Sequence, residues 1–143
     1  MLKVKFKRLH PSAEIPYKAT PGSAAFDLVA TSCEYEPYSQ TYTYGLGFAT
    51  EIPKGWCAKI YARSSVFKTM LDKVGGVCII DSDYRGEWFV KFRMPKGVWG
   101  KPYKLGERIA QCIFEPVPEV VWEESEELTH TERGSGAYGS TGR

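Results

Sequence analysis

The sequence predicts a single all-β domain, built as a sandwich, a jelly roll or a barrel. Many short runs are rich in apolar, aromatic and β-branched residues, turn-forming residues separate them, and only one segment shows helical spacing. The 143 residues, 43% hydrophobic and 25% charged, have the size and composition of one globular domain.

The first strand is expected near the N-terminus, where Leu2, Val4 and Phe6 alternate with lysines. Seven further strand-like runs follow it: 25–30, 41–50, 56–62, 77–80, 87–93, 109–116 and 119–122. Turn signals divide these runs: Pro21-Gly22, Pro53-Lys54-Gly55, Gly75-Gly76, Arg85-Gly86 and Pro95-Lys96-Gly97.

One segment departs from the β pattern. Its apolar residues fall at helical spacing: Val66, Phe67, Met70 and Leu71. Ser64 or Ser65 would cap the N-terminus of this short helix, directly after Arg63. The N-terminal end of a helix attracts anions, so the sequence offers a candidate phosphate site here. The alternative is that the serines only cap the helix.

The last eleven residues, RGSGAYGSTGR, form a glycine-rich tail over 133–143. Glycines allow several amide groups to bend toward one anion, and Arg133, Ser140 and Thr141 add further donors. A P-loop is excluded because Ser140 stands where its lysine belongs. The tail therefore indicates a flap that closes on a polyphosphate, and a disordered terminus without function is the alternative.

Residues 81–86 read DSDYRG after an apolar strand. Either Asp81 or Asp83 could be a general base that polarises a water molecule, although Asp, Ser and Gly are also ordinary turn formers. Phosphate ligands combined with an acidic turn are what nucleotide hydrolysis requires.

The net charge of +2 is unevenly distributed. Residues 119–132 hold six glutamates and no lysine or arginine, which leaves 19 basic against 11 acidic residues elsewhere. Such a basic body suits an anionic ligand, but we expect no nucleic-acid partner. The aromatic side chains of Trp56, Trp88 and Trp99 are expected in the core rather than as stacking platforms for bases.

The four cysteines form no CxxC pair, and three of them lie in apolar runs: Cys57, Cys78 and Cys112. These three are expected to be reduced residues of the core, and none of the four cysteines is expected to belong to a metal cluster. The sequence has neither a run of about 18 apolar residues nor a signal-peptide pattern at its N-terminus, so no membrane association is expected. We expect a cytoplasmic location, in the host cytoplasm if the source is viral.

Five segments, taken in order, resemble the trimeric dUTPase family. They are PGSAAFDL (21–28), ARSSVF (62–67), IIDSDYRGE (79–87), GERIAQCIF (106–114) and RGSGAYGSTG (133–142). The resemblance implies a distorted jelly roll of the β-clip type, over 1–132, with a flexible C-terminal flap over 133–143. It also implies a homotrimer that hydrolyses dUTP to dUMP and pyrophosphate, with Mg²⁺ held mainly on the triphosphate.

By this resemblance, Asp81 activates the water that attacks the α-phosphorus. Asp27 orients the water shell of the metal without binding it directly. The inner phosphates and their waters are held by a set of four residues: Arg63, Ser64, Ser65 and Gln111.

The resemblance also implies how the rest of the nucleotide is bound. Tyr84 lies under the deoxyribose, and the hairpin backbone around Gly76, Ile79 and Ile80 reads the uracil edge. Four residues of the tail grip the γ-phosphate, and Tyr138 stacks on the base: the four are Arg133, Gly139, Ser140 and Thr141.

Each implied site is shared by three subunits, with segments one, two and four from one, the third from another, and the tail from the last. Residues 119–132 are then expected to cross toward a neighbour, with residues 120–122 pairing there as a strand. The chain departs from the family pattern at Ala25, Cys78 and Tyr138, and an asparagine frequent in the third hairpin is missing. Two alternatives remain at this point: a dCTP deaminase of the same fold, and a non-catalytic trimer that binds a nucleotide or a protein.

Overall fold

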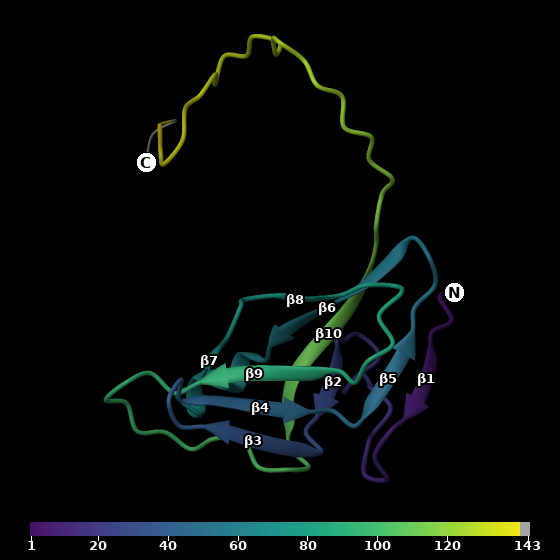
Figure 1. The fold of residues 1–143 in the computed structure, drawn as a ribbon, viewed down its shortest axis with the longest axis vertical. Helices are drawn as coiled ribbons and strands as arrows, with labels where there is room; N and C mark the ends of the chain where they lie inside the picture. Colours follow the sequence, from purple (N-terminus) through teal and green to yellow (C-terminus); the bar gives the residue numbers. More distant parts are fainter. Residues whose placement is uncertain (141–143) are drawn as a thin grey trace.

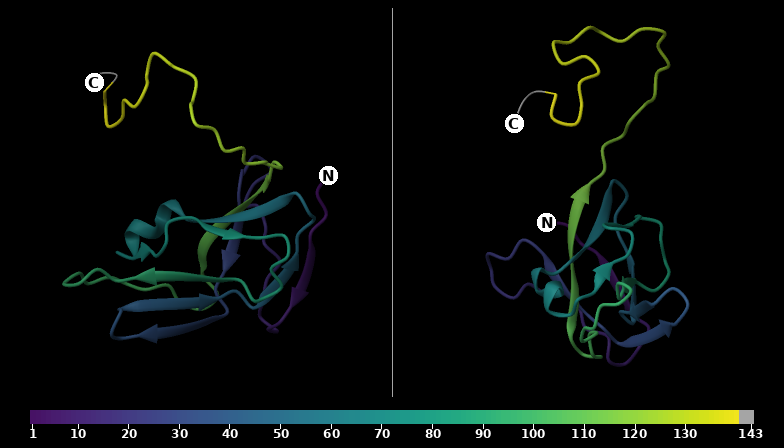
Figure 2. Two further views of the ribbon diagram at one scale, coloured as in Figure 1. Left: turned by 45° about the horizontal axis from the view of Figure 1, so that its top comes forward. Right: turned by 90° about the vertical axis from the view of Figure 1, so that its left-hand side faces the viewer.

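The computed structural model describes residues 1–140, and Figures 1 and 2 show a β barrel from which the C-terminal segment extends. Two four-stranded antiparallel sheets enclose the core, one in the order β2-β10-β6-β8 and the other in the order β3-β4-β9-β7, and β1 pairs with β5 beside them. The strands are β1 (Lys5–Arg8), β2 (Phe26–Val29), β3 (Ser32–Glu36), β4 (Thr41–Gly45), β5 (Phe48–Glu51), β6 (Trp56–Ala62), β7 (Asp72–Lys73), β8 (Cys78–Ile80), β9 (Phe89–Arg93) and β10 (Arg108–Pro116). The predicted all-β class is confirmed.

The core lies between the two sheets because their strands alternate inward and outward side chains. In β9, Val90 and Phe92 are fully buried, whereas the alternating positions Phe89, Lys91 and Arg93 are exposed. The facing sheet contributes Leu28, Ile60 and Cys112, each without measurable exposure. Burial raises the pKa of the Cys112 thiol to about 12, which keeps it protonated and unreactive.

Most strands lie where the sequence predicts them, but the single run predicted over 41–50 is wrong. The structure divides it into β4 and β5 at Gly47, whose φ is +70°. A Cβ at this position would lie 2.9 Å from both His10 Cβ and Thr31 Oγ1, so the chain needs glycine to leave one sheet for the next. Two short strands, β3 and β7, were not predicted.

The predicted helix is a 3₁₀ helix of five residues, η1 (Ser64–Lys68). Its N-cap is Arg63, which makes no side-chain capping bond, so the predicted serine cap is wrong. The helix ends early because Met70 adopts a φ of +58° and the backbone of Gly100 packs closely against Thr69. A helix of this length has only a small dipole, so its end alone does not create the predicted phosphate site.

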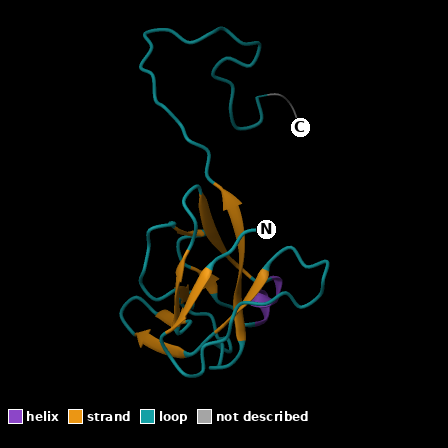
Figure 3. Cartoon of the chain, turned by 90° about the vertical axis from the view of Figure 1, so that its right-hand side faces the viewer, coloured by secondary structure: helices purple, strands orange, loops and turns teal. Residues whose placement is uncertain are grey.

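Residues 119–122 form no strand within the described single chain, and their pairing on a neighbouring subunit stays a prediction. After β10, the amide of Val117 donates to the carbonyl of Gly55, and the chain then leaves the barrel as the arm that Figure 3 shows. Val120, Val121 and Trp122 are 64%, 92% and 93% exposed, so their apolar surface faces solvent. We call residues 117–140 the C-terminal arm.

Of the tryptophans expected in the core, Trp88 is buried and donates its indole N–H to Thr50 Oγ1 at 3.1 Å. Trp56 is half-buried, and the expectation is wrong for Trp99, which is 94% exposed in the loop after β9. Within residues 1–140, no helix has the length and apolar character needed to cross a bilayer.

Leu46 tests this core. It is fully buried where β4 passes into β5, whereas Leu128 of the arm is 90% exposed. We expect Leu46→Ala to lower the free energy of unfolding by about 3–5 kcal/mol, because it removes buried methyl groups and leaves a cavity. The matched control Leu128→Ala should change it by less than about 0.5 kcal/mol. Denaturant unfolding followed by fluorescence measures both, and equal effects would contradict the assigned core.

Candidate active site

A carboxylate held between two arginines forms the centre of the candidate site. Asp27 Oδ1 accepts from Arg63 Nε at 2.9 Å, and Asp27 Oδ2 accepts from Arg108 Nη1 at 3.0 Å. The Asp27 side chain is only 11% exposed, so the carboxylate that accepts these charge-assisted bonds is largely shielded from water. Arg63 Nη1 also donates to the Arg108 carbonyl at 3.2 Å and to Ser65 Oγ at 3.4 Å.

The pairing of β10 with both β2 and β6 brings these residues together. Gln111 lies opposite Asp27 on one side and opposite Tyr61 on the other. Its Nε2 donates to the Ala62 carbonyl at 3.1 Å, one residue before Arg63. Three of the segments singled out in the sequence therefore converge at one end of this sheet.

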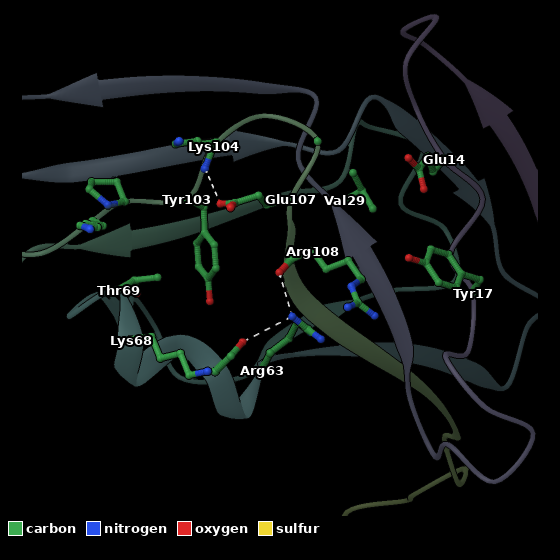
Figure 4. A pocket seen from close by; sticks show the side chains of 14 residues that line it. Glu14, Tyr17, Val29, Arg63, Lys68, Thr69, Tyr103, Lys104, Glu107 and Arg108 are labelled. Atoms are coloured by element: carbon green, nitrogen blue, oxygen red, sulfur yellow. Dashed lines mark hydrogen bonds between the residues drawn. The ribbon is translucent and has the colours of Figure 1, made fainter.

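Arg63 separates two hollows on this face. The first, of about 460 Å³, is lined by Asp27, Ser64 and Gln111 among others. The second, of about 590 Å³, contains Ser65 and is shown in Figure 4. Its charged lining is mainly basic, with two glutamates against a set of five cations: Arg63, Lys68, Lys101, Lys104 and Arg108. A cluster of this sign suits a polyanion.

The structure does not bring Asp81 to this cluster. Asp81 follows β8, and the register that pairs Ile80 with Ala58 places it beside Cys57, near the start of β6. Arg63 follows the other end of β6, so about 20 Å of strand separates the two positions at 3.3 Å per residue. Asp81 instead lines a third hollow, of about 690 Å³, together with Val117 and Glu119 of the C-terminal arm.

The segment after β8 is an ordered turn. The Tyr84 amide donates to the Asp81 carbonyl at 3.2 Å, and the Tyr84 hydroxyl donates to the Glu87 carbonyl at 2.9 Å. The Tyr84 ring crosses Gly86 so closely that a Cβ there would collide with it. The turn therefore holds Tyr84 in place and leaves the Asp81 side chain exposed.

The hairpin before Asp81 ends in an edge strand. Gly75 and Gly76 have φ values of +76° and +62°, which turn the chain into β8. Ile80 is buried in the core, whereas Ile79 is 60% exposed. Since β8 has a strand partner on one side only, part of its backbone faces outward and can bind a ligand edge.

The described part of the tail, residues 133–140, lies away from the barrel and from both groups of residues (Figure 1). Its described hydrogen bonds are local turns, in which the amide of Gly136 donates to the Arg133 carbonyl and that of Ser140 to the Ala137 carbonyl. Tyr138 is fully exposed and, like Gly139, has a positive φ. Thr141, predicted as a phosphate ligand, lies outside the described residues.

Arg108 is a site residue that was not predicted. It belongs to the GERIAQCIF segment, but its pairing with Asp27 joins residues 81 positions apart and could not be read from local sequence. Within residues 1–140, no three His, Cys, Asp or Glu side chains converge as a metal site. Each carboxylate oxygen of Asp27 accepts a hydrogen bond from an arginine. This arrangement fits contact with a metal ion through water molecules better than direct coordination of the ion.

The chain is similar to known proteins over nearly its whole length. The family model described as dUTPase matches residues 11–142. The chain is 37% identical to a deoxyuridine 5'-triphosphate nucleotidohydrolase of Rhodococcus erythropolis, over 99% of this chain and 87% of that protein. It is 36% identical to the enzyme of that name from Dictyoglomus turgidum, over 99% of both chains.

Solved structures show the same fold. A mutant of the Staphylococcus bacteriophage 80alpha dUTPase with dUpNHpp superposes with a TM-score of 0.83, at 23% identity and 99% coverage of both chains. A mutant dUTPase from phage phi11 of S. aureus, described with a structural Mg(II) ion, has a TM-score of 0.72, at 19% identity over 88% of this chain and 98% of that one.

Asp27→Asn tests the central carboxylate. The substitution removes the charged partner of Arg63 and Arg108, of which Arg63 is the more shielded, so we expect the free energy of unfolding to fall by about 1–3 kcal/mol. Glu14→Gln is the control, because Glu14 lines the second hollow but is exposed. Denaturant unfolding compares the two, and an equally small change in both would contradict a structural role for the paired carboxylate.

Proposed function

Because the chain belongs to the dUTPase family, we propose that it hydrolyses dUTP to dUMP and pyrophosphate in sites shared between the subunits of a homotrimer. The activity is that of a hydrolase acting on a phosphoric anhydride. The observation that supports shared sites is the separation of Asp81 from the Asp27–Arg63–Gln111 cluster along β6. Asp81 lies about 20 Å along the strand from the phosphate-binding residues of its own chain. It would therefore act on a nucleotide whose phosphates are bound by those residues of another subunit.

Asp81 is the proposed general base. Its carboxylate accepts a proton from water while the water oxygen bonds to the α-phosphorus. The bond from the α-phosphorus to the bridging oxygen breaks in line, and pyrophosphate leaves. The exposure of Asp81 beside a hollow supports this role, since attacking water must reach the carboxylate.

The phosphate end is proposed to consist of Arg63, Ser64, Ser65 and Gln111, supported by Asp27. Mg²⁺ bound on the triphosphate would neutralise part of its charge, and Asp27 would accept hydrogen bonds from waters of that ion. Arg108 holds Asp27 from the side opposite to Arg63 and thereby fixes the carboxylate.

The nucleoside end is proposed to lie on the hairpin of another subunit. Tyr84 would pack under the deoxyribose, and the outward backbone of Gly76, Ile79 and Ile80 would bind the uracil edge. The ordered turn that fixes Tyr84 over Gly86 supports a rigid sugar platform.

The tail is proposed to close from a third subunit. Tyr138 would stack on the base, and four tail residues would bind the γ-phosphate: Arg133, Gly139, Ser140 and Thr141. The exposed apolar side chains of Val120, Val121 and Trp122 support a crossing arm, because packing on a neighbour would remove them from water.

Nucleotide selectivity tests the proposed activity. Pyrophosphate release should be measured from dUTP, dCTP, dTTP, dATP, dGTP and UTP, with ammonia release from dCTP assayed in parallel. We expect pyrophosphate from dUTP above all others. Ammonia from dCTP would instead indicate a deaminase of this fold, and no turnover of any nucleotide would indicate a binding protein.

Asp81→Asn tests the base. We expect it to keep dUTP affinity while lowering kcat by about 10²–10⁴-fold, because only the proton acceptor is lost. Asp83→Asn in the same turn is the matched control and should retain most of the activity. Stopped-flow turnover and calorimetric binding separate the two quantities, and full activity in Asp81→Asn would refute the mechanism.

Complementation tests the shared site. Asp81→Asn and a chain ending at residue 132 should each be nearly inactive alone. Co-expressed with different tags, they should form mixed trimers with about a third of the wild-type activity, because each mixed trimer has one site of its three that combines an intact base with an intact tail. No recovery in purified mixed trimers would show that Asp81 and the tail act from one chain.

A further inference from the structure

A buried tyrosine hydroxyl without a hydrogen-bond partner lies beside the phosphate end. Tyr103 belongs to the loop between β9 and β10, and its Oη is shielded from solvent without a partner among the described residues. Burying a hydroxyl in this state costs free energy, and native structures rarely retain the cost without a reason. Tyr103 lines the second hollow together with Arg63 and Ser65.

Two aromatic side chains of the core hold the Tyr103 ring in place. Its ring centroid lies 5.5 Å from that of Phe92 and 6.2 Å from that of Tyr44. The Tyr44 hydroxyl donates to the Tyr103 carbonyl at 2.9 Å, so backbone and ring are held by one fully buried residue. Figure 4 shows the Tyr103 hydroxyl directed toward η1 and Arg63.

Ser65 is the group that this hydroxyl faces. Burial raises the pKa of the Tyr103 phenol, and the nearby Ser65 hydroxyl and Arg63 guanidinium counteract part of that shift. Both side chains line the same hollow, and the Tyr103 hydroxyl makes no hydrogen bond there with any described residue. Ser65 Oγ already accepts from Arg63 Nη1 at 3.4 Å, a long contact that leaves room for adjustment.

We propose that Tyr103 is a positioning residue that donates to Ser65 Oγ when the inner phosphates bind, and so directs the Ser65 proton to the phosphate. A serine hydroxyl has one proton and two acceptor positions. With Tyr103 and Arg63 donating to both acceptor positions, the Ser65 proton can only point outward as a donor. This inference rests on the proposed binding of inner phosphates by Ser65.

The test uses two ligands of the intact protein: dUDP, which carries the inner phosphates, and deoxyuridine, which carries none. Tyr103→Phe should weaken dUDP binding by about three- to tenfold in calorimetry, the usual effect of one hydrogen bond, and leave deoxyuridine binding unchanged. Its thermal midpoint should not fall, because the substitution removes an unpaired buried hydroxyl. Tyr42→Phe, in the same aromatic cluster, is the control and should leave both affinities unchanged.

A double-mutant cycle with Ser65→Ala shows whether Tyr103 acts through Ser65. In the Ser65→Ala background, Tyr103→Phe should have no further effect on dUDP affinity. Three results would each overturn the inference. Tyr103→Phe could leave dUDP affinity unchanged, or it could weaken deoxyuridine binding as much as dUDP binding. It could also weaken dUDP binding in the Ser65→Ala background as strongly as in the wild-type background. Hydrolysis of dUTP by the wild-type protein is measured separately, so failure of the proposed function is recognised on its own.

Discussion

The double pairing of β10 is the constraint on which the candidate site depends. Because β10 hydrogen-bonds to β2 on one side and β6 on the other, a single register sets the positions of Asp27, Gln111 and Arg63. If β10 shifted its pairing by one residue, the Gln111 side chain would face the core and the Cys112 side chain would face the surface. The complete burial of Cys112 shows which register the core packing requires. Packing of the core thereby fixes the polar geometry on the outer face.

The phosphate end and the tail differ in how far each is organised without ligand. Arg63 makes hydrogen bonds to a carboxylate, a hydroxyl and a carbonyl, so its guanidinium is already oriented. Oriented charges need little rearrangement when a phosphate binds. The described part of the tail, residues 133–140, makes local turns, and its ordering on a ligand would cost conformational entropy that phosphate contacts must offset.

Sequence was sufficient where local pattern decides the structure. Strand-like runs bounded by turn signals predicted β6 to its end residues and included β9 within the run over 87–93. It failed at Gly47, which the distant residues His10 and Thr31 enclose, and it missed β3, a strand whose side chains are all exposed. In the site, motif resemblance supplied Asp27 and Arg63, but the second arginine on Asp27 and the buried hydroxyl of Tyr103 arise only from tertiary packing.

The C-terminal arm also determines where a protease would cleave the extended part of this protein. Between Val117 and Ser140, Arg133 is the sole lysine or arginine, and it is exposed. A trypsin-like protease thus finds one cleavage position in the arm, at the junction of the acidic stretch and the glycine-rich tail. Cleavage there would leave the barrel intact and release the peptide after Arg133, so limited digestion offers a clean way to separate folding of the barrel from closure over its ligand.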